Sequence, residues 1–494
     1  MTAFVSAASL GSGLRSSSCC ADGETRTNDE AGNLRDATGV SLLSTDEQLR
    51  RPWGDMLPLL QGADVTLLTL ETVATTSDIH LPAKKFLEEA DRAGARGSTS
   101  FHKMDPRNLQ TLVTAGVDAV ALATNHAVDY DVGGLLETTG SLTNMGIANA
   151  GVGADRSEAL SPARISRGGV DIALFSFTDY INGFDRQGSD VGAATATRAG
   201  ANYLNTHGIR RFLPFSLWDT NGDAVITQDD VDSLIARSEE LDDPQARDWQ
   251  EVFEFCDVGF SGSVTTPSDQ RGVPSTVTDI AEPAGDGRVT VAEFREAMQG
   301  VEDGTRYDPG WLEYLQGVAA EITASRKHEF ELVVVGVTWG SNWQLVAEWP
   351  SFSPDAAIQM AARTLIDGGV DIIVGGGSHH LLGVEVYHGS FIIYGAGPLV
   401  DDYWFRQSVR NDLAFLYHVE VDRSSPRQIS NLRLTPLRRE MMVGSANRDA
   451  LQTNLLPRDD PDWLVLRDSF RQLCSGFGTV VQSADDTTEL LVMV

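Results

Sequence analysis

The sequence has few cysteines, few basic residues and no long apolar run, and each shortage excludes a class of protein. Four cysteines in 494 residues are too few for a disulfide framework. No apolar run reaches the length of a membrane-spanning helix. Only 38 Lys and Arg oppose 70 Asp and Glu, which gives a formal net charge of −32. That charge repels nucleic acid and anionic membranes, and it concentrates cations near the protein surface.

Two enzyme signatures are also absent from the sequence. No Gly-rich phosphate loop is followed by Lys-Ser or Lys-Thr, which argues against an NTPase. No G-x-S-x-G nucleophile motif occurs. Ser378 lies beside His379, but a catalytic triad is defined by spatial geometry and not by adjacency.

The chain is nevertheless long and ordinary in its apolar content, at 41%. It can bury a large core and is expected to hold more than one domain. Residues 1–45 show little periodicity and predict a disordered leader, and residues 486–494 predict a tail. The first ten residues make a weak candidate signal sequence, because no basic residue precedes them. The sequence assigns no cellular compartment, no oligomeric state and no protein partner or substrate.

Residues 219–230 resemble an EF-hand calcium loop. Calcium takes six to eight oxygen ligands, so side chains at alternate positions of one turn must converge. Oxygen ligands stand at loop positions 1, 3, 5, 7, 9 and 12 as Asp219, Asn221, Asp223, the Val225 carbonyl, Thr227 and Asp230. Ile226, at position 8, is expected to pair with a partner loop through a short strand.

Two departures from the EF-hand pattern lower the expected calcium affinity. Ala224 stands where the turn favours glycine, and Asp230 is shorter than the usual glutamate. The loop therefore predicts weak calcium binding or magnesium occupancy. The alternative interpretation is an acidic surface turn that binds no ion.

A second, degenerate loop is expected to pair with the first. The run 285–294 resembles the second half of an EF-hand loop, and its candidate ligands are Asp286, the Arg288 carbonyl and Glu293. Counting back places Glu282 and Ala284 at positions 1 and 3, which is a poor ligand set. Residues 208–218, 229–241 and 249–256 are the expected flanking helices.

Outside this region, apolar runs alternate with helical patterns, which indicates an α/β architecture. The expected strands are 63–70, 119–123, 171–177, 332–337, 371–374 and 391–394, and the expected helices are 109–115, 135–145, 311–325 and 356–368. Polar and Gly-rich segments follow these strands, where open α/β sheets build their sites.

The order of these motifs resembles the CapA family, the capsule and poly-gamma-glutamate synthesis proteins related to calcineurin-like metallophosphoesterases. The matching segments are 53–60, 63–73, 101–106, 123–130, 338–343, 375–380, 394–397, 401–403 and 476–479. The resemblance implies an α/β fold, a metallophosphoesterase-like β-sandwich flanked by helices. A mainly α-helical EF-hand pair, residues 206–307, would interrupt the family domain between its two parts, 46–205 and 308–485.

The family resemblance also implies a dinuclear metal centre, of which this chain keeps few ligands. Asn-Leu-Glu has become Thr69-Leu-Glu71, and His-Trp-Gly has become Thr338-Trp-Gly, which removes an imidazole. Gly376 stands at a further histidine position, and the first-strand Gly-Asp has no counterpart. The surviving candidates are Glu71, Asn125, His126, Asp129, His379 and His380. They predict either one residual transition-metal site, with Asn125, His126 and His379 as catalytic residues, or loops braced by hydrogen bonds alone.

Most other histidines and the tryptophans carry no such pattern. His80, His102, His207, His328, His388 and His418 are expected to be ordinary surface or loop residues, and Trp53, Trp339 and Trp343 to serve packing.

Three functions follow as hypotheses. The first is a calcium-binding protein on a CapA-like scaffold whose hydrolytic centre is degenerate. The second is a calcium-regulated, metal-dependent hydrolase of phosphoester or amide bonds. The third is a structural or adaptor protein.

Overall fold

The structure is a computed structural model of the 494-residue chain. It describes residues 2–10, 43, 45–80, 101–179, 192–204, 206, 225–227, 288–290, 311–329, 331–339, 352–354, 356–400, 408–422, 427, 429, 431–441, 451–484 and 487–493.

Two mixed β-sheets form the centre of the described structure. The larger runs in the order β20-β21-β18-β17-β1-β2-β5-β6, with β19 paired to β18. Its strands are β1 Thr2–Leu10, β2 Val65–Leu70, β5 Ala119–Ala121, β6 Ala148–Ala150, β17 Leu413–Glu420, β18 Asn431–Met441, β19 Leu451–Leu455, β20 Val481–Ser483 and β21 Leu490–Met493. The smaller, in the order β15-β16-β14-β13-β9-β8, comprises β8 Ala163–Arg167, β9 Val170–Thr178, β13 Leu332–Thr338, β14 Ile372–Gly376, β15 Val384–Tyr387 and β16 Ser390–Ile393.

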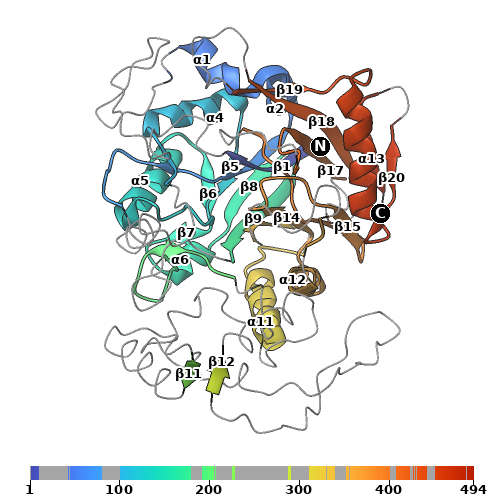
Figure 1. The fold of residues 1–494 in the computed structure, drawn as a ribbon. Helices are drawn as coiled ribbons and strands as arrows, with labels where there is room; N and C mark the ends of the chain where they lie inside the picture. The colour runs from blue at the N-terminus through green and yellow to red at the C-terminus, as the bar shows by residue number, and fades with distance from the viewer. Residues whose placement is uncertain are drawn as a thin grey trace, which may run out of the picture.

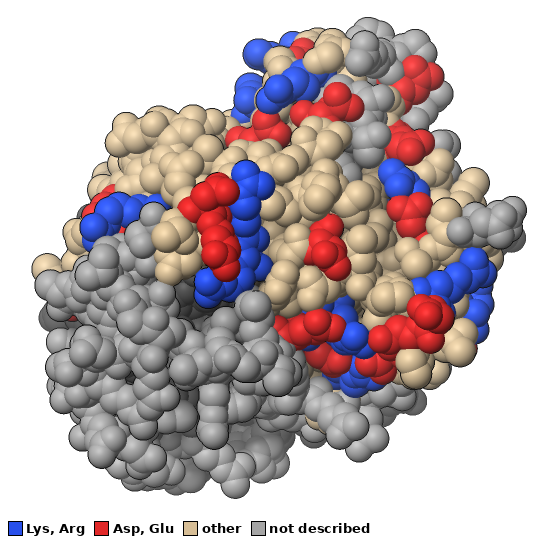
Figure 2. Space-filling model, turned by 90° about the horizontal axis from the view of Figure 1, so that it is seen from above, with Lys and Arg blue, Asp and Glu red and all other residues tan. Residues whose placement is uncertain are grey.

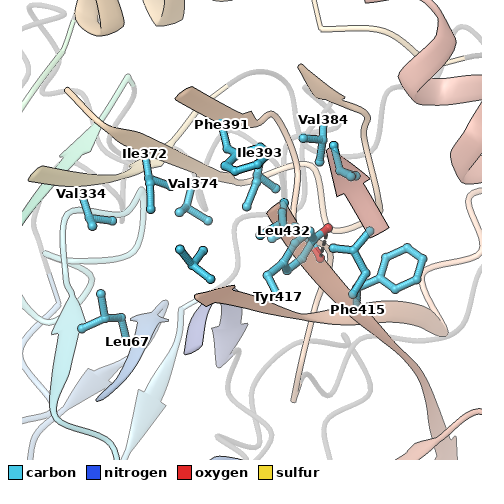
Figure 3. Packing of buried hydrophobic residues seen from close by; sticks show 14 of the residues in the cluster. Leu67, Val334, Ile372, Val374, Val384, Phe391, Ile393, Phe415, Tyr417 and Leu432 are labelled. Atoms are coloured by element: carbon cyan, nitrogen blue, oxygen red, sulfur yellow. Dashed lines mark hydrogen bonds between the residues drawn. The ribbon is translucent and has the colours of Figure 1, made fainter. Parts of the chain in front are cut away.

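The two sheets pack face to face over one hydrophobic core (Figure 3). Side chains from both sheets contribute to it: Leu67, Val334, Ile372, Val374, Val384, Phe391, Ile393, Phe415, Tyr417 and Leu432. Small residues allow the sheets to approach closely at one point. A Cβ atom on Gly336 of β13 would lie 2.9 Å from the Cβ of Ala121 in β5. Glycine at this position therefore allows β13 to lie close to β5.

Helices cover the outer faces of both sheets (Figure 1). The helices α11 Trp311–Ala324 and α12 Ala356–Asp367 bury their apolar faces on the smaller sheet. The helices α2 Leu57–Gly62, α4 Gln110–Ala115 and α5 Asp131–Asn144 do so on the larger sheet. Because both faces are covered, β2 and β13 are buried along their whole length. The predicted fold class, an α/β sandwich flanked by helices, is confirmed.

The remaining described elements are short, apart from the C-terminal helix α13. They are α1 Asp46–Arg50, η1 Arg51–Met56, β3 Val73–Ala74, β4 Lys103–Met104, η2 Pro106–Leu109, β7 Val152–Gly153, α6 Arg156–Leu160, β10 Gly200–Ala201 and α13 Pro461–Ser475. The strands β3 and β4 pair in parallel, which brings residues 71–75 beside residues 102–104.

Both termini differ from the sequence prediction. Residues 2–10 were expected in a disordered leader, but they form β1, which pairs with β2 in parallel and with β17 antiparallel. The expected tail contains β21, which pairs with β18 and β20. Residues 2–10 and 490–493 show no strong strand pattern in the sequence, because these strands are stabilised by pairing with strands distant in the sequence.

Within the predicted insertion the structure describes little beyond two short strands. The strand β11 Val225–Thr227 pairs antiparallel with β12 Arg288–Thr290, and Ile226 lies opposite Val289. The expected strand pairing through Ile226 is thus present. The other candidate calcium ligands, Asp219, Asn221, Asp223, Asp230, Asp286 and Glu293, lie outside the described residues, as do the expected flanking helices.

In the described part of the chain, every helix is too short or too polar to traverse a lipid bilayer.

Candidate functional site

The surviving family residues gather just after the carboxyl ends of parallel strands in both sheets. Glu71 follows β2, and Asn125 and His126 follow β5. From the smaller sheet, His379 and His380 follow β14. All five side chains are buried. The two sheets are joined near this end by a hydrogen bond of 3.0 Å from the Ala123 amide to the Ser176 hydroxyl of β9.

On the larger sheet, one carboxyl group contacts the His126 ring and the His102 backbone amide. His126 Nδ1 lies 2.7 Å from Asp129 Oδ2, and the backbone amide of His102 donates to that same oxygen at 2.6 Å. The two rings stack with centroids 3.4 Å apart and planes within 6°. His102 Nδ1 lies 2.9 Å from the Glu71 carbonyl oxygen, so this residue links three loops of the site.

His102 was expected to be an ordinary surface or loop residue, and that prediction is wrong. Its side chain is buried inside the site, with 3% of its surface exposed. The sequence offered one signal, since His102 stands within the family-like segment 101–106. His418, predicted in the same way, is buried elsewhere in the larger sheet.

On the smaller sheet, the turn after β14 carries two buried histidines, of which His379 lies next to Glu71. His379 has a positive φ of 56°, which is uncommon for a residue other than glycine. Its Nε2 atom lies 3.9 Å from Glu71 Oε1, which connects the loop after β14 to the loop after β2. The next residue, His380, stacks against Phe352 with ring centroids 4.4 Å apart.

Trp339 and Gly375 hold this turn in place. Trp339 Nε1 donates a hydrogen bond of 2.8 Å to the Tyr394 carbonyl oxygen. A Cβ atom on Gly375 would lie 2.2 Å from that oxygen, so glycine is required there. Trp53 and Trp339 are both buried in hydrophobic clusters, which confirms their predicted packing role. Trp343 lies outside the described residues.

The protonation state of His380 follows from its surroundings. Burial lowers the pKa of His380 to about 4, and the neighbouring His379 contributes in the same direction, so the ring is neutral near pH 7. His380 Nδ1 lies 3.0 Å from the Leu381 carbonyl oxygen. Because a carbonyl only accepts, Nδ1 carries the ring proton, and Nε2 presents a lone pair.

Three polar groups at this end of the sandwich are buried without a hydrogen-bond partner among the described residues. They are the Thr72 hydroxyl, the Asn125 side-chain amide (both Oδ1 and Nδ2), and His380 Nε2. Leaving such groups unsatisfied costs about 1–3 kcal/mol each. The loops therefore hold these atoms in place at a cost in stability, which is typical of a binding site.

The described side chains do not fit the two-metal centre that the family resemblance implies. No group of three or more His, Cys, Asp or Glu within the described ranges is arranged to hold a metal ion. Thr338 and Gly376 supply no imidazole at the ends of β13 and β14. A site with fewer than three good protein ligands does not hold a divalent metal ion stably.

One further carboxyl group belongs to the same end of the fold, although sequence patterns did not single it out. Asp179 follows β9 and is fully buried. Its Oδ2 atom accepts 2.8 Å from the Thr206 hydroxyl, and its amide donates 2.9 Å to the Thr338 carbonyl oxygen. Thr206 is the first residue of the predicted insertion.

Taken together, the fold and these residues define a two-sheet α/β sandwich with a cluster of buried polar residues at its strand ends. Residues 28–403 match the family model described as "Bacterial capsule synthesis protein PGA_cap". The chain belongs to this capsule synthesis family.

Individual relatives are similar over different lengths. A "Probable polyglutamine synthesis accessory protein" of Mycobacterium tuberculosis is 25% identical over 472 residues, covering 93% of this chain and 88% of that protein. The "PGA biosynthesis protein CapA" of Bacillus subtilis is 27% identical over 139 residues, 28% of this chain and 33% of that protein.

The "Capsule biosynthesis protein CapA" of Bacillus anthracis is 24% identical over 178 residues, 35% of this chain and 40% of that protein. Among solved structures, a Staphylococcus aureus protein in complex with alpha-ketoglutarate aligns with 10% identity and a TM-score of 0.30, over 85% of this chain and 53% of that one. That similarity is too low to support a conclusion.

Proposed function

We propose that this chain is a calcium-binding accessory protein of capsule or polyglutamate synthesis whose metallophosphoesterase-type centre has become degenerate. The family match over residues 28–403 supports the role in synthesis. The depleted ligand set at Thr338 and Gly376 supports the loss of the metal centre.

The observation that carries the calcium proposal is the register of β11 and β12. Ile226 lies opposite Val289, and these are the position-8 residues of the two predicted loops. Two EF-hand loops joined in this way would place Asp219, Asn221, Asp223, the Val225 carbonyl, Thr227 and Asp230 around one calcium ion. The second loop, with Asp286, Arg288 and Glu293, would act mainly as its structural partner.

Elemental analysis of the purified chain tests this proposal directly. The protein is equilibrated with calcium and manganese, and free ions are then removed. We expect about one calcium per chain from the single complete loop. Asp219→Ala and Asp230→Ala should each abolish calcium retention, whereas Asp229→Ala, at a loop position that supplies no ligand, should not. Calcium retained equally by Asp219→Ala would contradict the proposal.

A second candidate function is a calcium-regulated hydrolase of phosphoester or amide bonds. The short contact between His126 Nδ1 and Asp129 favours it, because a carboxyl group that orients an imidazole is a common arrangement for proton transfer. Manganese, iron or zinc retained together with calcium, and turnover that His126→Ala abolishes, would favour this candidate over a degenerate centre. If neither site retains an ion, a structural or adaptor role remains.

A further inference from the structure

The chain reaches the predicted insertion through a short segment that contacts both sheets. This connecting segment, residues 200–204 and 206, is buried except for Tyr203, which is partly exposed. Ala201 packs in the hydrophobic cluster on the outer face of the larger sheet. Leu204 packs in the corresponding cluster on the smaller sheet. The segment is therefore part of the folded core on both sides of the sandwich.

Backbone hydrogen bonds attach the connecting segment to one strand end in each sheet. The Asn202 amide donates 2.7 Å to the carbonyl oxygen of Gly151, which follows β6 of the larger sheet. The Leu204 amide donates 2.9 Å to the carbonyl oxygen of Thr178, the last residue of β9 in the smaller sheet. The Thr178 amide donates 3.0 Å to the Asn202 carbonyl oxygen in return. A displacement of the segment would thus break bonds to both sheets.

A side-chain contact extends this attachment toward the candidate site. Asn202 Nδ2 donates 3.1 Å to the Ser176 carbonyl oxygen, and the Ser176 hydroxyl accepts 3.0 Å from the Ala123 amide. The packing at this point is tight, because a Cβ atom on Gly151 would lie 2.5 Å from the Cβ of Ser176 and 2.8 Å from that of Ala123. Ala123 lies two residues before Asn125. Contacts therefore run without a gap from the connecting segment to the loop after β5.

Both ends of the predicted insertion are anchored on the smaller sheet. At its start, Thr206 Oγ1 donates 2.8 Å to Asp179 Oδ2, and the Asp179 amide donates 2.9 Å to the Thr338 carbonyl oxygen at the end of β13. Beyond its end, Trp311 begins α11 and is buried in the same hydrophobic cluster as Leu204. The core therefore fixes where the insertion leaves and where it returns.

Anchored ends link the folding of an inserted unit to the stability of the core that holds it. Core contacts that fix the two ends remove part of the chain entropy that the insertion would lose on folding around calcium. Because coupling is reciprocal, calcium bound to the insertion must stabilise those same contacts. We propose that the connecting segment couples calcium binding in the insertion to the strand ends that carry Asn125 and His126. The inference rests on the proposed calcium-binding function.

Hydrogen–deuterium exchange of the full chain, with and without calcium, tests this coupling. Calcium should slow exchange over residues 119–126 and 171–178, which include the attached strand ends. Residues 461–475 of α13 make none of these contacts and should exchange at an unchanged rate. Elemental analysis of the same samples shows independently whether calcium is bound. Retained calcium without slower exchange over residues 119–126 would overturn the coupling but not the calcium proposal, whereas no retained calcium would overturn both.

Two variants interrupt the coupling at different points. Thr206→Val removes the hydroxyl that donates to Asp179 at nearly constant volume. It should reduce the calcium-dependent slowing over both segments and weaken calcium binding about fivefold, the low end of typical coupling between two sites. Ser176→Ala removes the acceptor of the Ala123 amide, so it should keep the slowing over residues 171–178 and lose it over residues 119–126.

Thr143→Val is the matched control for Thr206→Val. The Thr143 hydroxyl also donates a hydrogen bond, 2.9 Å to the Thr139 carbonyl oxygen, but Thr143 is exposed on α5. This variant should keep the calcium affinity and the exchange pattern of the wild type. Thermal unfolding in calcium-free buffer verifies that each variant is folded. Wild-type affinity and wild-type slowing in both Thr206→Val and Ser176→Ala would overturn the role of the connecting segment.

Discussion

Single buried histidines tie the stability of this protein to pH. Burial lowers the pKa of His418 to about 3, with Arg433 acting in the same direction, and its Nε2 atom lies 2.6 Å from the Thr435 hydroxyl. In the unfolded chain a histidine has a pKa of about 6.5. Below that pH the unfolded state binds a proton that the folded state does not, so stability is lost as the pH falls from about 6.5 toward 3.

We therefore predict that the wild-type protein loses about 2 kcal/mol more than a His418→Gln variant when the pH is lowered from 7 to 5. Urea unfolding midpoints at the two pH values measure the difference. His388→Gln is the matched control, since 63% of the His388 side chain is exposed. An acid loss of the same size in wild type and His418→Gln would show that this residue does not carry the effect.

At the scale of elements, the question is whether residues 2–10 belong to the folded sheet, where they form β1. β1 lies between β2 and β17, and it pairs with β17 through residues 2–4 and with β2 through residues 3–5, 9 and 10. A disordered leader would exchange its amide hydrogens within seconds, whereas a central strand exchanges only when the sheet opens. We predict that the paired residues within 3–10 are protected to the same degree as β2.

Hydrogen–deuterium exchange followed by mass spectrometry measures this protection. Peptides that cover residues 65–70 serve as the internal reference for a buried strand. Rapid exchange over residues 3–10, with slow exchange over residues 65–70, would show that the N-terminal segment is a disordered leader after all.

At the scale of the whole molecule, the dominant physical feature is the net charge of −32. On the face in Figure 2, acidic side chains lie next to basic ones. Elsewhere in the described residues, Arg438 forms ion pairs with Glu440 and Asp460. The predicted insertion, residues 206–307, carries 21 acidic and 8 basic residues, so much of the excess lies there.

Because like charges repel in the compact state, screening by salt should stabilise the protein. We predict that the thermal midpoint at pH 7.5 rises as sodium chloride is increased from about 0.05 to 0.3 M, over which the Debye length falls by more than half. Near pH 4.5, the isoelectric point, the rise should vanish. A salt response of equal size at both pH values would exclude charge repulsion as its cause.

The sequence predicted the parallel strands of the sandwich but missed the antiparallel half of the larger sheet. The buried parallel strands were found because both faces are covered, which produces continuous apolar runs such as that of β13. The strands β17 to β21 were not anticipated. In β18, buried Leu432 and Leu434 alternate with Arg433, a weaker pattern than a continuous run.

The site was predicted in part, since Glu71, Asn125, His126, Asp129, His379 and His380 were named from motif order and do lie at one end of the fold. His102 and Asp179 were missed. Their roles depend on contacts with residues 24 or more positions away, which no local spacing reveals.

The sequence by itself determined the acidic charge, the family, the alternation of strands and helices, and the candidate calcium loop, because each is written in local composition or spacing. Only the tertiary structure decided that residues 2–10 form a central strand, that His102 stacks on His126, and that Asn125, Thr72 and His380 are left with unsatisfied polar atoms. Those outcomes depend on which distant segments come together, and that is fixed by packing of the two sheets and not by any one stretch of the chain.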